Sequence, residues 1–153
     1  MSRVQLALNV DDLERSIAFY SKLFDTAPAK VRPGYANFAV TDPPLKLVLI
    51  ENPGSSDTVN HLGVEVVDTA AVDAVQRRVS AAGLASIDER NTSCCYATQD
   101  KFWVEAAPGG ERWEVYTVLA DSETFGGGDD AERTVCCGTT VAEGSPAGSG
   151  SCC

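Results

Sequence analysis

Two neighbouring cysteines, Cys94 and Cys95, are the most chemically suggestive pair in this 153-residue sequence. They lie in the stretch NTSCCYATQD, whose polar residues are typical of a loop and differ from the apolar surroundings of a core cysteine. The alternative interpretation is structural, with one buried thiol and one exposed thiol that have no role. Structural zinc sites commonly use Cys-x2-Cys spacing, so adjacent thiols instead favour a soft atom such as trivalent arsenic, cadmium or mercury.

The other cysteines also occur as adjacent pairs, Cys136 with Cys137 and Cys152 with Cys153. Their spacing is unlike that of a secreted disulfide framework, so we expect free thiols in a reducing compartment. These pairs could capture a soft atom and deliver it to Cys94 and Cys95. They could also be dispensable, which is the interpretation we favour.

A second group of candidates consists of Gln5, His61 and Glu114. Strand alternation places Gln5 and His61 at equivalent positions of two similar runs, QLALNV and HLGVEV, on the face opposite the aliphatic residues. An amide oxygen, an imidazole and a carboxylate suit a divalent transition metal and leave about three of six octahedral positions open. His61 is the only histidine, and a lone histidine is more often structural than a ligand. The shared placement on repeated strands is what favours a metal site.

The elements that must position these residues form a repeated pattern. Apolar or alternating runs predict strands at 4–10, 35–40, 45–51, 61–67, 102–106 and 112–119. A helix is predicted from Asp11, with Glu14 completing a capping box, and a second helix starts near Asp68 or Thr69 and stops at Gly83. Strand, helix and short strands therefore occur twice, which predicts an α+β fold of two similar modules around a pseudo-twofold axis. In the first module the position of Glu114 is taken by Val48 or Leu49, neither of which binds a metal.

Composition narrows the classes of partner. The net charge of −10 and the scattered Lys and Arg residues argue against nucleic acid. No apolar run approaches the roughly 20 residues needed to span a bilayer, and the first residues do not resemble a signal peptide, so we expect a cytoplasmic protein. From Ala120 the sequence loses its apolar periodicity, and we predict a domain over 1–125 and a disordered Gly-, Ser- and Cys-containing tail over 126–153.

These motifs resemble the vicinal oxygen chelate superfamily, which includes glyoxalase I, extradiol dioxygenases and bleomycin- and fosfomycin-resistance proteins. The stretches HLGVEV, CCYATQDK and WEVYTVLAD are very similar to those of organoarsenical carbon–arsenic lyases, and the cadmium-induced proteins share much of this pattern. The resemblance covers about residues 1–126. It implies tandem βαβββ modules, at about 1–54 and 58–119, that form a metal-binding cleft.

The resemblance also implies an activity. It indicates an Fe(II)-dependent dioxygenase that converts trivalent methylarsenite or trivalent aromatic arsenicals to arsenite, using dioxygen. Gln5, His61 and Glu114 match the metal ligands of that family, and Cys94 and Cys95 match its substrate thiols. Extradiol enzymes have histidine where this chain has Gln5, and a weaker amide ligand predicts lower metal affinity. Methyl or aryl preference, and a monomer or a homodimer with paired or swapped modules, stay open.

Two rival functions remain at the level of sequence. The first is a non-enzymatic protein that sequesters cadmium or arsenite through its thiols, which would need no oxygen. The second is a metal-dependent thiol transferase of the fosfomycin-resistance type. That class needs a cationic pocket for a phosphonate, and the sequence offers no cluster near Glu114 beyond Arg112.

Overall fold

A computed structural model describes residues 2–55 and 58–126 of the chain. These residues form two helices and one eight-stranded mixed sheet, which confirms the α+β class. The elements in chain order are β1 (Arg3–Val10), α1 (Leu13–Leu23), β2 (Lys30–Arg32), β3 (Tyr35–Val40), β4 (Leu45–Glu51), β5 (Val59–Glu65), α2 (Thr69–Ala81), β6 (Ser86–Cys94), β7 (Ala97–Val104) and β8 (Trp113–Asp121).

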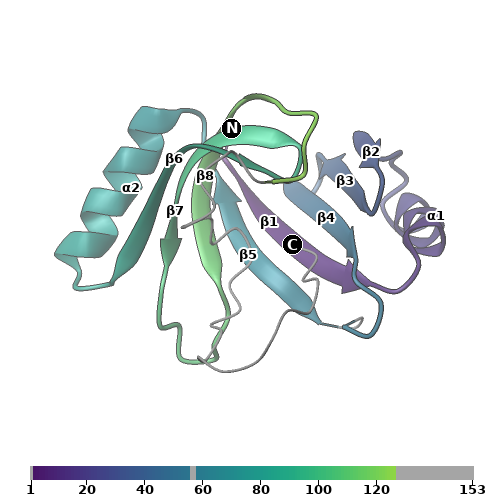
Figure 1. Cartoon of the computed structure of the whole chain (residues 1–153), viewed down its shortest axis with the longest axis horizontal. Coiled ribbons are helices and arrows are strands. Elements are labelled where there is room, and N and C mark those ends of the chain that lie inside the picture. Colours follow the sequence, from purple (N-terminus) through teal and green to yellow (C-terminus); the bar gives the residue numbers. More distant parts are fainter. Residues whose placement is uncertain (1, 56–57, 127–153) are drawn as a thin grey trace, which may run out of the picture.

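The strand order shows the predicted repeat directly. The sheet runs β2-β3-β4-β1-β5-β8-β7-β6, so each βαβββ module occupies one half. The first strand of each module pairs in parallel with its last strand, β1 with β4 and β5 with β8. The two halves join where β1 and β5 pair antiparallel, and Figure 1 shows these strands side by side in the middle of the molecule. This arrangement is the pseudo-twofold symmetry expected from the sequence.

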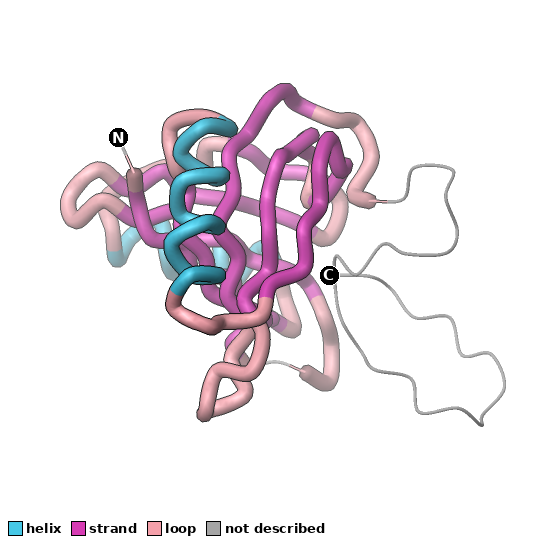
Figure 2. Tube along the Cα trace, turned by 90° about the vertical axis from the view of Figure 1, so that its left-hand side faces the viewer, coloured by secondary structure: helices cyan, strands magenta, loops and turns pink. Residues whose placement is uncertain are grey.

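The two helices pack on one face of the curled sheet and leave the other face for the site. Helix α1 packs against aliphatic residues of β1 and β4 such as Leu8 and Leu47, and α2 packs against Phe102 and Val115 of β7 and β8. Figure 1 shows the helices at opposite ends of the molecule, and Figure 2 shows α2 lying along the strands of its module. The opposite face of β1 carries Gln5, which is buried on the inner side of the sheet.

Both helices begin at an aspartate cap. The side chain of Asp68 accepts from the backbone N–H of Ala71, as expected. For α1 the cap is Asp12, which accepts from Arg15 N at 2.9 Å, so the predicted start at Asp11 is wrong by one residue. Gly83 follows the end of α2 with φ +81°, a left-handed conformation that glycine adopts without strain.

The predicted loop around the cysteines is wrong. Residues 86–94 and 97–104 form the antiparallel hairpin β6–β7, with Cys94 paired to Ala97 across a two-residue turn. Strand β6 lies at the edge of the sheet, where polar side chains are compatible with a strand because one side faces solvent. Its sequence, SIDERNTSC, therefore lacks the apolar content that indicates a strand.

Within residues 2–55 and 58–126, neither helix has the length and apolar character required to cross a bilayer.

Candidate metal and thiol site

Three neighbouring strands bring the metal-ligand candidates to one point on the inner face of the sheet. Gln5 lies on β1, His61 on β5 and Glu114 on β8. Gly63 pairs with Gln5 on one side and with Glu114 on the other. A Cβ atom at Gly63 would lie 3.1 Å from Cγ of Glu114 and 3.3 Å from Cβ of Gln5. Glycine at this position therefore lets the two side chains approach each other.

The polar ends of these side chains fit around a single ion. Gln5 Nε2 lies 3.0 Å from His61 Nε2 and 2.8 Å from Glu114 Oε1, and the histidine and glutamate atoms are 3.4 Å apart. Two ligand atoms at about 2.1 Å from a metal, with a right angle between their bonds, are about 3.0 Å apart. Within residues 2–55 and 58–126 no three His, Cys, Asp or Glu side chains could hold a metal, so a site here requires the Gln5 amide.

His61 has the tautomer that a metal ligand needs. Its Nδ1 lies 2.7 Å from Oδ1 of Asn60, an oxygen that only accepts, so Nδ1 carries the ring proton. In the neutral imidazole the lone pair is then on Nε2, which lies next to Gln5 and Glu114. The ring of Trp103 packs edge-on at 5.5 Å and helps to fix the orientation of the imidazole.

Lys101, a buried cation that the sequence analysis missed, lies beside Glu114. Its Nζ is 3.2 Å from Glu114 Oε2 and 3.6 Å from Oε2 of Glu89. Burial alone would raise the pKa of Glu114, but the charge of Lys101 holds that pKa well below its ordinary value. Glu114 is therefore a carboxylate at neutral pH. The signal in the sequence was alternation along β7, which puts Lys101 in phase with the buried Gln99.

Tyr116 and Glu65, also missed, lie next to Gln5. The Tyr116 hydroxyl contacts the Gln5 side chain and lies 2.9 Å from Oε2 of Glu65. Burial and the nearby Glu114 raise the pKa of Tyr116 well above its ordinary value, so the hydroxyl keeps its proton. Burial would raise the pKa of Glu65, but Lys46 and Arg3 lower it below the ordinary value, so this group is a carboxylate.

Cys94 and Cys95 are free cysteines whose Sγ atoms are 3.2 Å apart. With bonds of about 2.3 Å from each sulfur, a single soft atom reaches both sulfurs at roughly a right angle. A hydrogen bond with Cys94, followed by burial, raises the pKa of Cys95 well above its ordinary value, so the pair contains neutral thiol at neutral pH. The other pairs, Cys136 with Cys137 and Cys152 with Cys153, lie outside the described residues.

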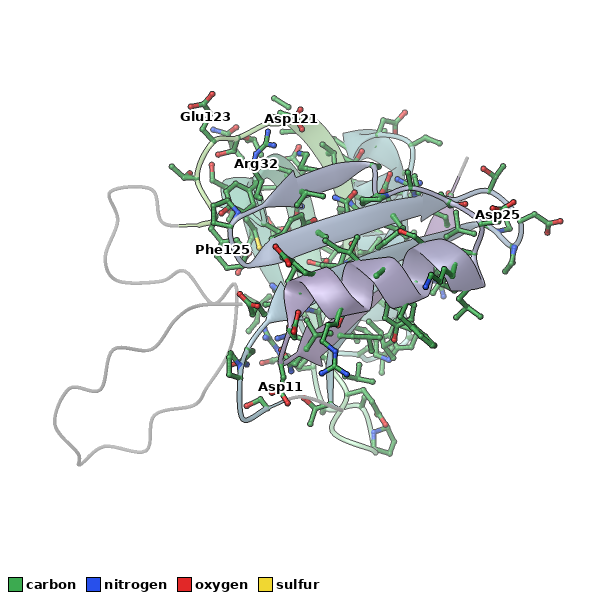
Figure 3. The ribbon with its side chains drawn as sticks, turned by 90° about the vertical axis from the view of Figure 1, so that its right-hand side faces the viewer. Asp11, Asp25, Arg32, Asp121, Glu123 and Phe125 are labelled. Atoms are coloured by element: carbon green, nitrogen blue, oxygen red, sulfur yellow. The ribbon has the colours of Figure 1, made fainter. Side chains whose placement is uncertain are left out.

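The turn that carries the thiols is stabilised by contacts with Phe125 and Lys30. Cys95 and Tyr96 have φ of 55° and 61°, a left-handed pair that costs about 1–2 kcal/mol per non-glycine residue. The backbone N–H of Cys95 donates to the carbonyl of Phe125, and Lys30 Nζ donates to the carbonyl of Tyr96. The Phe125 ring packs 5.4 Å from that of Tyr96. Figure 3 shows Phe125 at the same end of the molecule as Asp121, the acidic partner of Lys30.

A cavity of about 230 Å³ contains both groups of candidates. Gln5, His61 and Glu114 line it together with Cys94 and Cys95. Sequence alternation indicated that the three candidate ligands share a face, but it did not place the thiols in the same cavity. The remaining wall combines apolar and charged residues: Ala29, Ala39, Val48, Ala97, Val118, Tyr35, Asn37, Gln99, Arg3, Lys30, Lys46, Glu65 and Asp121.

Comparison with known proteins adds three findings. Residues 3–115 match the Glyoxalase/Bleomycin resistance protein/Dioxygenase superfamily. The chain is 63% identical over 150 residues to cadmium-induced protein CadI of Mycobacterium tuberculosis strain H37Rv, covering 94% of this chain and 98% of the relative. It is 61% identical over 138 residues to the trivalent organoarsenical cleaving enzyme of Thermomonospora curvata, covering 90% and 89%.

Solved structures share the fold. Homoprotocatechuate 2,3-dioxygenase of Brevibacterium fuscum, in its E323L mutant, aligns with a TM-score of 0.55 at 18% identity. The alignment covers 78% of this chain and 33% of that one.

Proposed function

Because the chain belongs to the Glyoxalase/Bleomycin resistance protein/Dioxygenase superfamily, we propose that it cleaves the carbon–arsenic bond of trivalent organoarsenicals to release arsenite, with Fe(II) and dioxygen. The observation that carries the proposal is the shared cavity, which two adjacent thiols line together with three potential metal ligands. The high identity to an organoarsenical cleaving enzyme supports the same substrate class.

The two thiols bind the arsenic atom of the substrate. In this step arsenic exchanges two hydroxyl groups for the sulfurs of Cys94 and Cys95. Each hydroxyl leaves as water with the proton of one thiol, so arsenic stays trivalent and no separate base is required. The raised pKa of Cys95 means that its sulfur carries the proton that leaves with one hydroxyl group as water. Pentavalent arsenicals lack such ready exchange and would be refused.

The cavity then orients the organic group. With arsenic fixed at the turn, the carbon substituent lies among Val48, Tyr35 and the three ligand side chains, all of which line the same space. When bound at Gln5, His61 and Glu114, Fe(II) would supply open coordination positions and electrons for the activation of dioxygen. Lys101 keeps Glu114 ionised, and Asn60 keeps the lone pair of His61 available.

The decisive experiment incubates the purified protein with Fe(II), a thiol reductant and methylarsenite, with and without dioxygen, and identifies the arsenic species. We expect catalytic release of arsenite only with dioxygen, and its loss in Cys94→Ala/Cys95→Ala. The matched control is Cys136→Ala/Cys137→Ala, another adjacent pair, which we expect to retain turnover. Unchanged turnover without Cys94 and Cys95 would contradict the proposal.

The identity to a cadmium-induced protein favours a second candidate function, the sequestration of cadmium or arsenite by the same thiols. Sequestration is stoichiometric and independent of oxygen. In the experiment above it would give arsenic bound to the protein in a fixed ratio, with no turnover and no difference between the aerobic and anaerobic samples.

A further inference from the structure

The Gln5 side chain lies between two sets of hydrogen-bonding partners. The amide orientation that suits one set does not suit the other. On one side, Gln5 Oε1 faces the hydroxyl of Tyr116. On the other side, Nε2 faces Nε2 of His61 at 3.0 Å and Oε1 of Glu114 at 2.8 Å. The two ends of a carboxamide have nearly the same shape, so hydrogen bonding decides which end faces which side.

In this orientation of the Gln5 amide, its contact with the Tyr116 hydroxyl has no proton available for a hydrogen bond. The hydroxyl of Tyr116 has one proton and two oxygen neighbours, Gln5 Oε1 at 2.5 Å and Glu65 Oε2 at 2.9 Å. Glu65 is a carboxylate paired with Arg3 at 3.1 Å and Lys46 at 3.2 Å, and it can only accept. A hydrogen bond to a charged acceptor is the stronger one, so the proton belongs between Tyr116 and Glu65. The hydroxyl oxygen then faces the oxygen of Gln5 with no proton between them.

Reversal of the amide supplies a proton to the contact with Tyr116 but removes the donor on the side of His61 and Glu114. With its NH₂ group turned to Tyr116, Gln5 donates to the hydroxyl oxygen, and the hydroxyl donates onward to Glu65. The Gln5 oxygen then faces the Glu114 carboxylate and the lone pair of His61. Three acceptors within 3.4 Å of one another repel each other unless a cation lies between them. A metal ion satisfies all three acceptors at once.

We propose that Tyr116, anchored by Glu65, is a positioning residue that turns the Gln5 amide so that its carbonyl oxygen faces the metal position. The inference rests on the metal site of the proposed function. According to this inference, Tyr116 and Glu65 are not ligands themselves but orient the neutral Gln5 amide so that its oxygen can bind the metal. Outer partners of this kind typically change metal affinity by about 10- to 100-fold when removed.

The test uses Co(II) as the probe, bound to the full chain without arsenical and followed by calorimetry and by visible absorption. Tyr116→Phe removes the hydroxyl and retains the ring, and we expect Co(II) affinity to fall about 10-fold or more. Glu65→Gln removes the charge that fixes the phenol proton and should lower the affinity in the same direction. The matched control is Tyr20→Phe, at a tyrosine of α1 that packs against the core on the helix side of the sheet and does not line the cavity.

A double-mutant comparison separates positioning from general structure. If Tyr116 acts through Gln5, Tyr116→Phe should cause no further loss of Co(II) affinity in a Gln5→Ala background. Unchanged affinity in Tyr116→Phe, or a further loss in Gln5→Ala/Tyr116→Phe, would overturn the inference. Failure of the unmodified protein to bind Co(II) would overturn the inference and the metal site together. Normal Co(II) binding without arsenite release would overturn the proposed reaction alone.

Discussion

At the scale of single residues, the site depends on buried charges that stabilise one another. Glu114 and Lys101 are both at most 3% exposed. A carboxylate taken out of water is costly unless it is paired, and here Lys101 supplies the compensating charge without a metal. The site can therefore keep Glu114 ionised before any metal arrives, which is the state that a ligand requires.

The first prediction concerns Lys101→Met. Removal of one partner of a buried pair typically costs about 3–5 kcal/mol of unfolding free energy. The folded-state pKa of Glu114 lies below its unfolded value, so its contribution is present above about pH 4.3 and is lost as pH falls through the folded pKa. Without Lys101 the burial of Glu114 is no longer offset and its folded pKa rises, so Lys101→Met should gain less stability than the parent between acidic and neutral pH. Urea unfolding at several pH values measures both effects.

The control for this experiment is Lys22→Met, at an exposed lysine in the last turn of α1. Its stability should stay within about 0.5 kcal/mol of the parent at every pH. Identical pH profiles for the parent and Lys101→Met would show that Lys101 does not set the charge of Glu114.

A second prediction concerns the thiols. Because the hydrogen bond with Cys94 and burial raise the pKa of Cys95, the alkylation rate of Cys95 should reach its midpoint at a higher pH in the folded protein than in guanidinium. An ordinary thiol has its midpoint near about pH 8.5. Iodoacetamide labelling with peptide mass spectrometry gives the midpoint separately from the absolute rate, which also depends on access. Equal midpoints in the folded and unfolded chain would contradict this assignment.

The sequence predicted the ligand candidates better than their surroundings. Period-two alternation was enough to place Gln5, His61 and Glu114 on one face, because strand geometry fixes which side chains share a face. It could not identify Lys101 or Tyr116 as partners of those residues. Their contacts depend on register across strands, such as the pairing of Glu65 with Tyr116 in β5 and β8, which no local pattern encodes.

At the scale of elements, the β6–β7 hairpin and the segment after β8 act together on the thiols. Where the sequence indicated a loop, the structure has a tight turn whose backbone hydrogen-bonds to Phe125 and to the side chain of Lys30. Cys94 also forms an isolated bridge with Gly126. Left-handed residues at functional turns persist only when the surrounding structure stabilises them. Here the segment after β8, residues 122–126, provides that support and is called the strap below.

A third prediction follows for Phe125→Ala. Loss of the ring that packs on Tyr35 and Tyr96 should loosen the strap, so the amide of Cys95, which donates to residue 125, should exchange faster. Hydrogen–deuterium exchange of the peptide containing the turn measures this. The control is Phe19→Ala, at a ring that is 59% exposed on α1, which should leave exchange at the turn unchanged. Unaltered protection of Cys95 in Phe125→Ala would show that the strap does not hold the turn.

At the scale of the whole molecule, a symmetric framework carries an asymmetric site. Ala7 pairs with Val48 in the first module as Gly63 pairs with Glu114 in the second, which confirms Val48 as the equivalent of Glu114. The first module therefore supplies Gln5 and an apolar wall, while the second supplies His61 and the carboxylate. The apolar Val48 at this position leaves space for an organic group, which a fourth metal ligand would fill.

The fourth prediction tests whether the two modules form one cooperative unit through the seam of β1 and β5. Gly63→Ala places a Cβ atom 3.1 Å from Glu114 and 3.3 Å from Gln5, and overpacking of this kind typically costs about 1–3 kcal/mol. Both tryptophans, Trp103 and Trp113, lie in the second module, so fluorescence follows that half and far-ultraviolet circular dichroism follows both. In urea, Gly63→Ala should lower both midpoints equally.

The control substitution is Gly126→Ala, whose added Cβ atom meets only the backbone oxygen of Ser93 at 3.6 Å, an ordinary contact distance. Its two midpoints should match those of the parent. A fluorescence midpoint that falls in Gly63→Ala while the circular dichroism signal splits into two transitions would mean that the modules unfold separately. The site would then depend on docking between two independent halves, whereas a common shift means that the continuous sheet itself holds Gln5 against His61 and Glu114.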